Sequence, residues 1–306
     1  MPKKIAIRLI LLLIGLTLSH LIVNANLTKP PIVFSTISLH NDSQLGLLSP
    51  EITVDRNGVW REASLHDLGV GQKFHFFVQN DFLAHTVGEV NVGKLTEPFA
   101  QVSTNTKIKE NESFWGFYST GQKIKFQGIG EVLKPEIISE AAQQELARPQ
   151  VTEPAGVKMM LQKVIQSDWA NILRDLPVGA QWVKNAEPAL NIESFLTGDL
   201  NGDKNPDYVL IIGAGGFGNE NSGPAAMVVY ITSHTQYQRI PIDYWKTTDD
   251  YKGWPQLLFI KDLNDDRAAE LFIAHSDSDT NVPIVYSWAG QGFIKVYEGK
   301  NELTPL

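Results

Sequence analysis

Short runs of hydrophobic residues, in part alternating with polar ones, occupy the first half of the chain after residue 52. They include Val70–Val78, Val87–Val92, Ser113–Tyr118 and Gln122–Phe126. Asn-Gly, Gly-Gln and Asn-Asp pairs stand between them, and such pairs are typical of turns. Short strands separated by turns predict a mainly β fold that starts with a small antiparallel β-barrel or sandwich, which we place at residues 26–133.

The pattern changes to helical spacing after a linker that holds Pro149 and Pro154. Apolar residues then recur on one face of a predicted amphipathic helix from about Ala155 to Leu176, and Pro177 and Gly179 end it. The members of this stripe are Val157, Met160, Leu161, Val164, Ile165, Trp169, Ile172, Leu173 and Leu176. A shorter helix is predicted at 135–148, so residues 134–154 form a helix and linker. We expect the long helix to pack on a sheet formed by the rest of residues 155–306.

Two acidic loops stand out in this C-terminal region. The first runs from Asp199 to Asp207, and the second runs from Asp262 to Glu270 and begins 63 residues later. Each loop leads directly into an apolar, β-branched run that predicts a strand. The shared spacing within the loops and the apolar run that follows each of them indicate an internal repeat.

The spacing of oxygen-bearing side chains in these loops suits a hard cation, since Ca²⁺ takes six to eight oxygens from a tightly turning segment. An EF-hand is a poor alternative because it needs a Gly at loop position six, a Glu at position twelve and flanking helices. Here position six is Lys204 or Arg267, and position twelve is Leu210 or Ile273. Polar β-turns without a metal are the other interpretation, because Asn and Asp side chains form turns by bonding to the backbone. A dockerin-type tandem is disfavoured, since its two loops lie closer together.

Asp-Leu-Asn-Gly-Asp before Pro-Asp-Tyr-Val-Leu-Ile, and Asp-Leu-Asn-Asp-Asp before Ala-Glu-Leu-Phe-Ile, resemble the calcium loops of FG-GAP or VCBS-type repeats. Residues 285–296 resemble the closing hairpin of such a unit, so the resemblance covers about residues 190–300. It implies two blade-like units of an integrin-like β-propeller, too few for a closed propeller. It also implies calcium ligands in each loop, with the seventh position contributing its backbone carbonyl. They are Asp199, Asn201, Asp203, Asn205, Asp207, Asp262, Asn264, Asp266 and Glu270. The loops depart from the family pattern at position six, where the usual Gly is missing, and Ala268 replaces a polar residue at position seven.

The N-terminus has the features of an export signal. Lys3, Lys4 and Arg8 precede an apolar run from Leu9 to Leu18, and Val23-Asn24-Ala25 matches a small-residue cleavage site. The run is short for a membrane span, which needs about 20 residues. We therefore expect residues 1–25 to be a signal peptide, with a retained N-terminal anchor as the alternative. The expected location is periplasmic, cell-surface or extracellular.

Composition narrows the range of partners. The formal net charge is −8, which disfavours nucleic acid and anionic membranes as partners and suits cations. The chain has no Cys, so neither disulfides nor a lipid-modified Cys contribute. A protein or glycan ligand is the expected partner.

Other motifs give weaker signals. Residues 213–218 match G-x-G-x-x-G, but no helix is predicted after them, so nucleotide binding is disfavoured. His75 and His85 would need to meet on a hairpin to bind a metal. The Trp residues outside the helix are expected in the core, with an exposed sugar-stacking row as the alternative.

These observations favour an exported, calcium-stabilised binding or interaction module without evident catalysis. One alternative is an exported hydrolase of polysaccharide or peptide, for which a carboxylate pair or a His–carboxylate pair in a cleft would be the distinguishing feature. The other is a structural envelope protein whose repeats assemble edge to edge.

Overall fold

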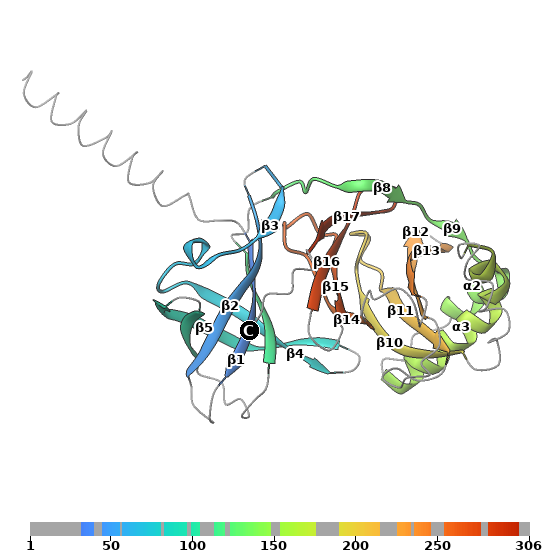
Figure 1. Ribbon diagram of the computed structural model, residues 1–306. Helices are drawn as coiled ribbons and strands as arrows, with labels where there is room; N and C mark the ends of the chain where they lie inside the picture. The colour runs from blue at the N-terminus through green and yellow to red at the C-terminus, as the bar shows by residue number, and fades with distance from the viewer. Residues whose placement is uncertain are drawn as a thin grey trace, which may run out of the picture.

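The fold is mainly β, as the alternation of short apolar runs predicts, and its sheets are antiparallel (Figure 1). A computed structural model gives the structure. The residues that it describes are 32–39, 45–55, 57–80, 83–96, 99–104, 113–119, 123–147, 154–175, 190–214, 225–233, 236–245, 254–276 and 281–299. The predicted signal peptide lies outside these residues. Within them, no helix is long and apolar enough to cross a membrane.

Seven strands in the N-terminal half form one sheet in the order β1-β7-β4-β5-β6-β2-β3. Strand β1 also pairs with β2, so six of these strands form a continuous ring of pairings, called the N-terminal ring below. The strands of this sheet are β1 (Ile32–Leu39), β2 (Leu45–Val54), β3 (Trp60–Glu62), β4 (Lys73–Asn80), β5 (Leu83–Thr96), β6 (Phe99–Thr104) and β7 (Ser113–Ser119), of which β3 lies outside the ring, and a 3₁₀ turn η1 (Leu65–Asp67) follows β3.

Two five-stranded sheets follow in the C-terminal half. The first C-terminal sheet has the order β10-β11-β12-β13-β9, and the second has the order β14-β15-β16-β17-β8. The strands of the first are β10 (Leu190–Gly198), β11 (Asp207–Ala214), β12 (Ala225–Ser233) and β13 (Gln236–Trp245). Those of the second are β14 (Trp254–Lys261), β15 (Glu270–Ser276), β16 (Asn281–Trp288) and β17 (Phe293–Glu298). The fifth strand of each sheet comes from earlier in the chain, as β8 (Ile129–Leu133) and β9 (Glu136–Ile137).

Two helices follow β9 in the chain and precede β10, and they are α2 (Glu140–Leu146) and α3 (Pro154–Asp175). The prediction of a helix from Pro135 was wrong at its start, because Glu136 and Ile137 pair with β13 instead. Ser139 then begins α2 as its N-cap, and its hydroxyl accepts a hydrogen bond from the Ala142 N–H at 3.1 Å. The predicted strand over 122–126 is also wrong, since residues 123–126 lie outside any strand.

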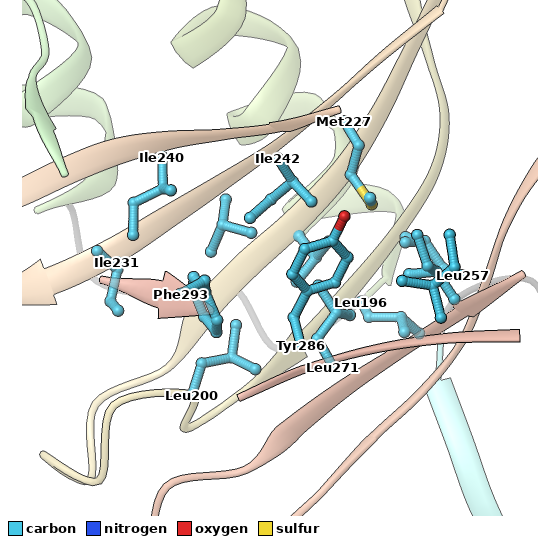
Figure 2. Close-up of a cluster of buried hydrophobic side chains, with 14 of the residues drawn as sticks. Leu196, Leu200, Met227, Ile231, Ile240, Ile242, Leu257, Leu271, Tyr286 and Phe293 are labelled. Atoms are coloured by element: carbon cyan, nitrogen blue, oxygen red, sulfur yellow. The ribbon is translucent and has the colours of Figure 1, made fainter. Parts of the chain in front are cut away.

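A large hydrophobic core lies between the two C-terminal sheets (Figure 2). Alternate residues of β11 and β12, including Val209, Ile211 and Met227, meet Leu271 and Ile273 of β15 there. These side chains are at most 1% exposed, and full burial of each contributes about 1.5–3 kcal/mol. The two sheets therefore stack face to face.

The outer faces of this stack are also covered. Leu161, Ile165 and Trp169 of α3 pack with Phe195 and Tyr230 on the first C-terminal sheet. On the other side, Trp60 and Phe126 pack with Phe272 and Tyr297 of the second. The molecule is thus a row of layers, from the N-terminal ring through the two sheets to the helices (Figure 1).

Candidate functional site: two acidic loops

The first acidic loop, residues 199–207, joins β10 to β11 and is shaped by its own side chains. Asp199 accepts hydrogen bonds from the Gly202 and Lys204 N–H groups, each at 2.8 Å. Asn201 accepts from the Asp203 N–H at 3.0 Å, and Asp203 accepts from the Asn205 N–H at 2.8 Å. These are turn-forming bonds of the Asx kind, and they hold the loop closed without any ligand.

The second loop, residues 262–270, joins β14 to β15 and repeats four of the first loop's hydrogen bonds at the same offsets. Asp262 accepts from the Arg267 N–H at 2.9 Å, which matches the bond from Lys204 to Asp199. Asn264 accepts from the Asp266 N–H at 3.2 Å, and Asp266 accepts from the Ala268 N–H at 2.9 Å. The two loops, paired from the sequence, therefore share the bonds that join positions six and one, five and three, and seven and five, whereas the bond from position four to position one is found in the first loop.

Positive backbone φ angles fall at loop positions four and six in both copies. They are 80° at Gly202 and 70° at Lys204 in the first loop, and 57° at Asp265 and 84° at Arg267 in the second. The family pattern has Gly at position six, yet Lys204 and Arg267 adopt the left-handed conformation there. Such a conformation costs a non-Gly residue about 1–2 kcal/mol, which the surrounding hydrogen bonds offset.

The ninth position of each loop is a buried carboxylate. Asp207 and Glu270 are both 0% exposed. Asp207 accepts from the Leu200 N–H at 2.7 Å and from the Thr232 N–H at 2.9 Å, whereas Glu270 accepts from the Leu263 N–H at 2.9 Å and from the Ser287 hydroxyl at 3.0 Å. Each carboxylate therefore ties position two of its own loop to a neighbouring strand. Thr232 and Ser287 could not be found from the sequence, because they lie 25 and 17 residues after their partners.

Burial sets the electrostatics of these groups. It raises the pKa of Asp207 to about 7, with the nearby Asp203 charge adding to the effect. Burial likewise raises the pKa of Glu270 well above its ordinary value, and the charges of Asp266 and Asp262 add to this. Burial also acts on Asp203, but hydrogen bonds from the Asn205 backbone and the Thr232 hydroxyl leave the pKa of Asp203 below its usual value. A cation nearby would favour the ionised form of all three carboxyl groups.

The two loops touch each other. The Ala269 N–H donates to the Asp199 carbonyl oxygen at 3.0 Å. Gly202 lies against the other loop so closely that a Cβ at this position would be 3.4 Å from the Ala268 nitrogen. The two loops therefore lie side by side, and together they hold seven carboxylates, namely Asp199, Asp203, Asp207, Asp262, Asp265, Asp266 and Glu270.

The donor set of these loops fits a hard cation. A carboxylate oxygen has more than one lone pair, so an oxygen bonded to a backbone N–H can still bind a metal. In the second loop, Asp262 Oδ1 is buried and has no hydrogen-bond partner. Burying an oxygen without a partner costs free energy, and a cation would supply that partner. Across the described residues, however, no three Asp, Glu or His side chains converge as a ready metal cluster, so the oxygens would have to turn toward an ion.

The structure also places the weaker candidates. In the hairpin of β4 and β5, His75 lies opposite Glu89 and His85 lies opposite Val78, so the two His residues are not paired. Trp60 and Trp169 are 6% exposed and lie in the core, as expected. Residues 215–218 of the glycine motif lie outside the described residues.

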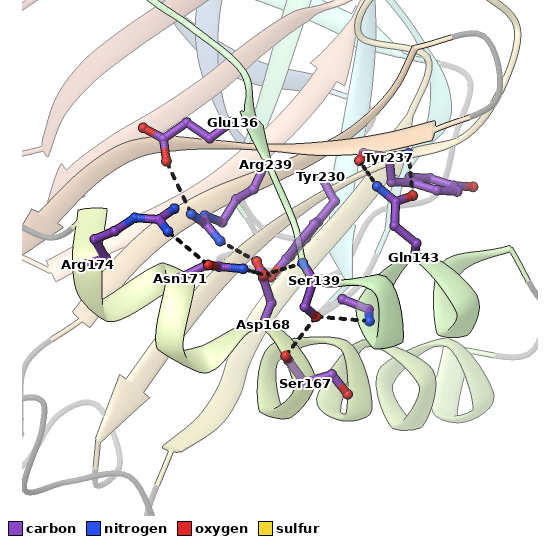
Figure 3. Close-up of polar contacts among 11 residues, drawn as sticks. Glu136, Ser139, Gln143, Ser167, Asp168, Asn171, Arg174, Tyr230, Tyr237 and Arg239 are labelled. Atoms are coloured by element: carbon purple, nitrogen blue, oxygen red, sulfur yellow. Dashed lines mark hydrogen bonds and ion pairs between the residues drawn. The ribbon is translucent and has the colours of Figure 1, made fainter.

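A buried polar network near α3 was not predicted (Figure 3). The Asp168 carboxylate forms an ion pair with Arg239, and both side chains are 0% exposed. It also accepts from the Ser139 N–H at 3.0 Å and from the Asn171 amide at 2.7 Å. The network joins both helices to β13. Because its central ion pair is buried, we assign the network a role in stability.

Comparison of the chain with protein-family models, with curated proteins and with solved structures gives no match.

Proposed function

We propose that the protein is an exported binding or interaction module whose C-terminal sheets are stabilised by calcium at the two acidic loops. One observation carries the proposal. The loops share four hydrogen bonds at the same positions, and each ends in a fully buried carboxylate. Chance turns would not share this arrangement. The residues that would hold the ions are the nine identified from the sequence.

Calcium would neutralise carboxylates that otherwise repel one another at this end of the molecule. On this proposal the two sheets correspond to two blade-like units of the FG-GAP or VCBS type, and the N-terminal ring corresponds to the small predicted barrel. A protein or glycan is the proposed partner. Since the faces of both sheets are covered, and β9 and β8 pair with the edges of β13 and β17, we propose the loops as the surface for contact.

Thermal unfolding of the full chain, with calcium and with a chelator, tests the proposal. A ligand that binds only the folded state stabilises it by about 2.7 kcal/mol at a hundredfold excess over Kd. We expect a lower midpoint in chelator, and no difference for a variant that carries Asp203→Ala and Asp266→Ala. Equal unfolding midpoints of the native chain with calcium and with chelator would show that calcium does not stabilise the fold.

One observation favours the hydrolase as a second candidate. His275 of β15 is 6% exposed, and its Nε2 lies 3.8 Å from an Asp243 carboxylate oxygen on β13. This is a His–carboxylate pair across the two C-terminal sheets, but it is buried and its 3.8 Å separation exceeds hydrogen-bond reach. The pair would have to close and become accessible to a substrate before His275 could act as a general base. A screen of polysaccharide and peptide substrates with the native chain and with His275→Ala distinguishes the candidates. Turnover that is lost in His275→Ala would favour the hydrolase.

A further inference from the structure

The two acidic loops are joined through one peptide unit. The Ala269 N–H donates to the Asp199 carbonyl oxygen at 3.0 Å, so position eight of the second loop is bonded to position one of the first. Ala269 is 7% exposed, and its N–H lies just outside the ladder of β14 and β15, which ends at Glu270. The bond is therefore a direct and sheltered link between the loops.

Two glycine contacts keep the loops together on either side of this bond. Gly198, directly before the first loop, lies so close to Ile260 of β14 that a Cβ at position 198 would be 2.7 Å from the Ile260 side chain. Gly202, in the middle of the first loop, lies against the backbone of Arg267 and Ala268. A displacement of one loop therefore displaces the other.

The peptide unit that makes the link also carries a proposed calcium ligand. On the proposed function, position seven of each loop contributes its backbone carbonyl, and in the second loop this is the carbonyl of Ala268. In a planar trans peptide the C=O and the N–H point in opposite directions, so the Ala268 carbonyl points away from Asp199. A cation on that carbonyl would polarise the peptide and strengthen the Ala269 N–H as a donor.

The first loop provides a natural reference for this link, because its own position eight is Pro206. Proline has no N–H, so the first loop cannot make the reverse bond. The loops share four hydrogen bonds and have positive φ angles at positions four and six. Proline at position eight is therefore compatible with the loop conformation that the two copies have in common.

We propose that the two loops bind calcium as one coupled unit, in which the peptide between Ala268 and Ala269 transmits occupancy of the second loop to Asp199 of the first. The inference rests on the proposed function. A bound ion in the second loop fixes the donor that holds position one of the first loop, so less ordering remains when the first loop binds its ion. By linkage the effect is reciprocal, and an ion in the first loop favours binding in the second.

Charge acts against this coupling, because two dications repel each other. The loops hold seven carboxylates against the two cations Lys204 and Arg267, so their negative charge exceeds the charge of two calcium ions. The second ion therefore still enters a negative site. We expect the link to set the sign of the coupling, and the test below changes the link without changing any charge.

Calcium titration by calorimetry on the full chain tests the coupling with Ala269→Pro and its control, Ala269→Gly. Ala269→Pro removes the N–H and gives the second loop the residue that the first loop has at this position. The proline ring also takes more room than the hydrogen it replaces, so the loops separate at this point. Ala269→Gly shortens the same side chain but keeps the N–H.

The native chain and Ala269→Gly should bind two ions with positive cooperativity. In Ala269→Pro the cooperativity should be lost, and the affinity for the second ion should fall by about fivefold, the effect of one hydrogen bond. One ion per chain, or two independent sites with the same affinities in the native chain and in Ala269→Pro, would overturn the coupling and leave the proposed function standing. No binding heat from the native chain would overturn both.

Amide hydrogen exchange, measured by mass spectrometry, gives a second test that does not need the proline variant. In Asp203→Ala the second loop keeps its ligands, and calcium should slow exchange in the first loop as well as in the second. In Asp266→Ala the reverse should hold, while β5 and β6 of the N-terminal ring stay unchanged as an internal reference. Slower exchange confined to the loop that keeps its ligands would show that occupancy is not transmitted, and would overturn the coupling.

Discussion

The buried pair of Asp168 and Arg239 gives the most quantitative prediction, and the change is Arg239→Met. This substitution leaves the Asp168 carboxylate, which is 0% exposed, without its charged partner. Removing one member of a buried ion pair destabilises a protein by about 3–5 kcal/mol, because the other charge stays buried. Asp168 keeps donors from Ser139, Asn171 and Tyr230, at 3.0, 2.7 and 3.4 Å. We therefore expect the lower end of that range, about 3 kcal/mol.

Urea denaturation followed by circular dichroism and by tryptophan fluorescence measures this loss. The control is Arg61→Met, which breaks an ion pair with Asp67 at 2.5 Å in which the Arg61 side chain is 48% exposed. Surface pairs of this kind contribute about 1 kcal/mol or less. Adding Asp168→Asn to Arg239→Met should recover part of the loss, since no uncompensated charge then remains buried. Equal losses for Arg239→Met and Arg61→Met would refute the reasoning.

Three further predictions concern the loops and the helix cap. In chelator, the free energy of unfolding should fall as pH rises from 5 to 8. The pKa of Asp207 is raised to about 7 in the folded state, so its contribution is full below its unfolded pKa and is lost as pH rises through 7. Calcium should reduce that fall. Urea denaturation at pH 5 and at pH 8 measures it, and a higher free energy of unfolding at pH 8 than at pH 5 in chelator would contradict the idea. Asp203→Ala should remove more of the calcium-dependent rise in melting temperature than Asp266→Ala, because Pro206 stiffens the first loop; the reverse order in paired thermal scans would count against this. Ser139→Ala should cost about 0.5–2 kcal/mol through loss of the α2 cap, and an unchanged urea midpoint would exclude that role.

The loops could be predicted from the sequence because their conformation is local. Asp199 and Asn201 bond to backbone groups between two and five residues away, so the spacing of oxygen-bearing side chains encodes the turn itself. The apolar stripe of α3 was predictable for a similar reason, since residues three and four apart share one face of a helix.

Strand β9 and the buried pair of Asp168 and Arg239 depend on partners far away in the chain. Strand β9 has two residues, and its Ile137 side chain is 80% exposed, so no hydrophobic pattern marks it. Its assignment as a strand comes only from pairing with β13, about a hundred residues later. Asp168 interrupts the apolar face of α3 as an ordinary polar residue would, and only Arg239, 71 residues away, makes it a core residue.

Isothermal titration of the full chain with calcium tests the central claim most directly. The predicted result is a binding heat with a Kd of about a millimolar or tighter, as in extracellular calcium modules, and only weak competition from Mg²⁺. The variant that carries Asp203→Ala and Asp266→Ala should give no such heat. Absence of heat from the native chain at millimolar calcium, or the same heat from both proteins, would contradict the claim that these two loops bind calcium.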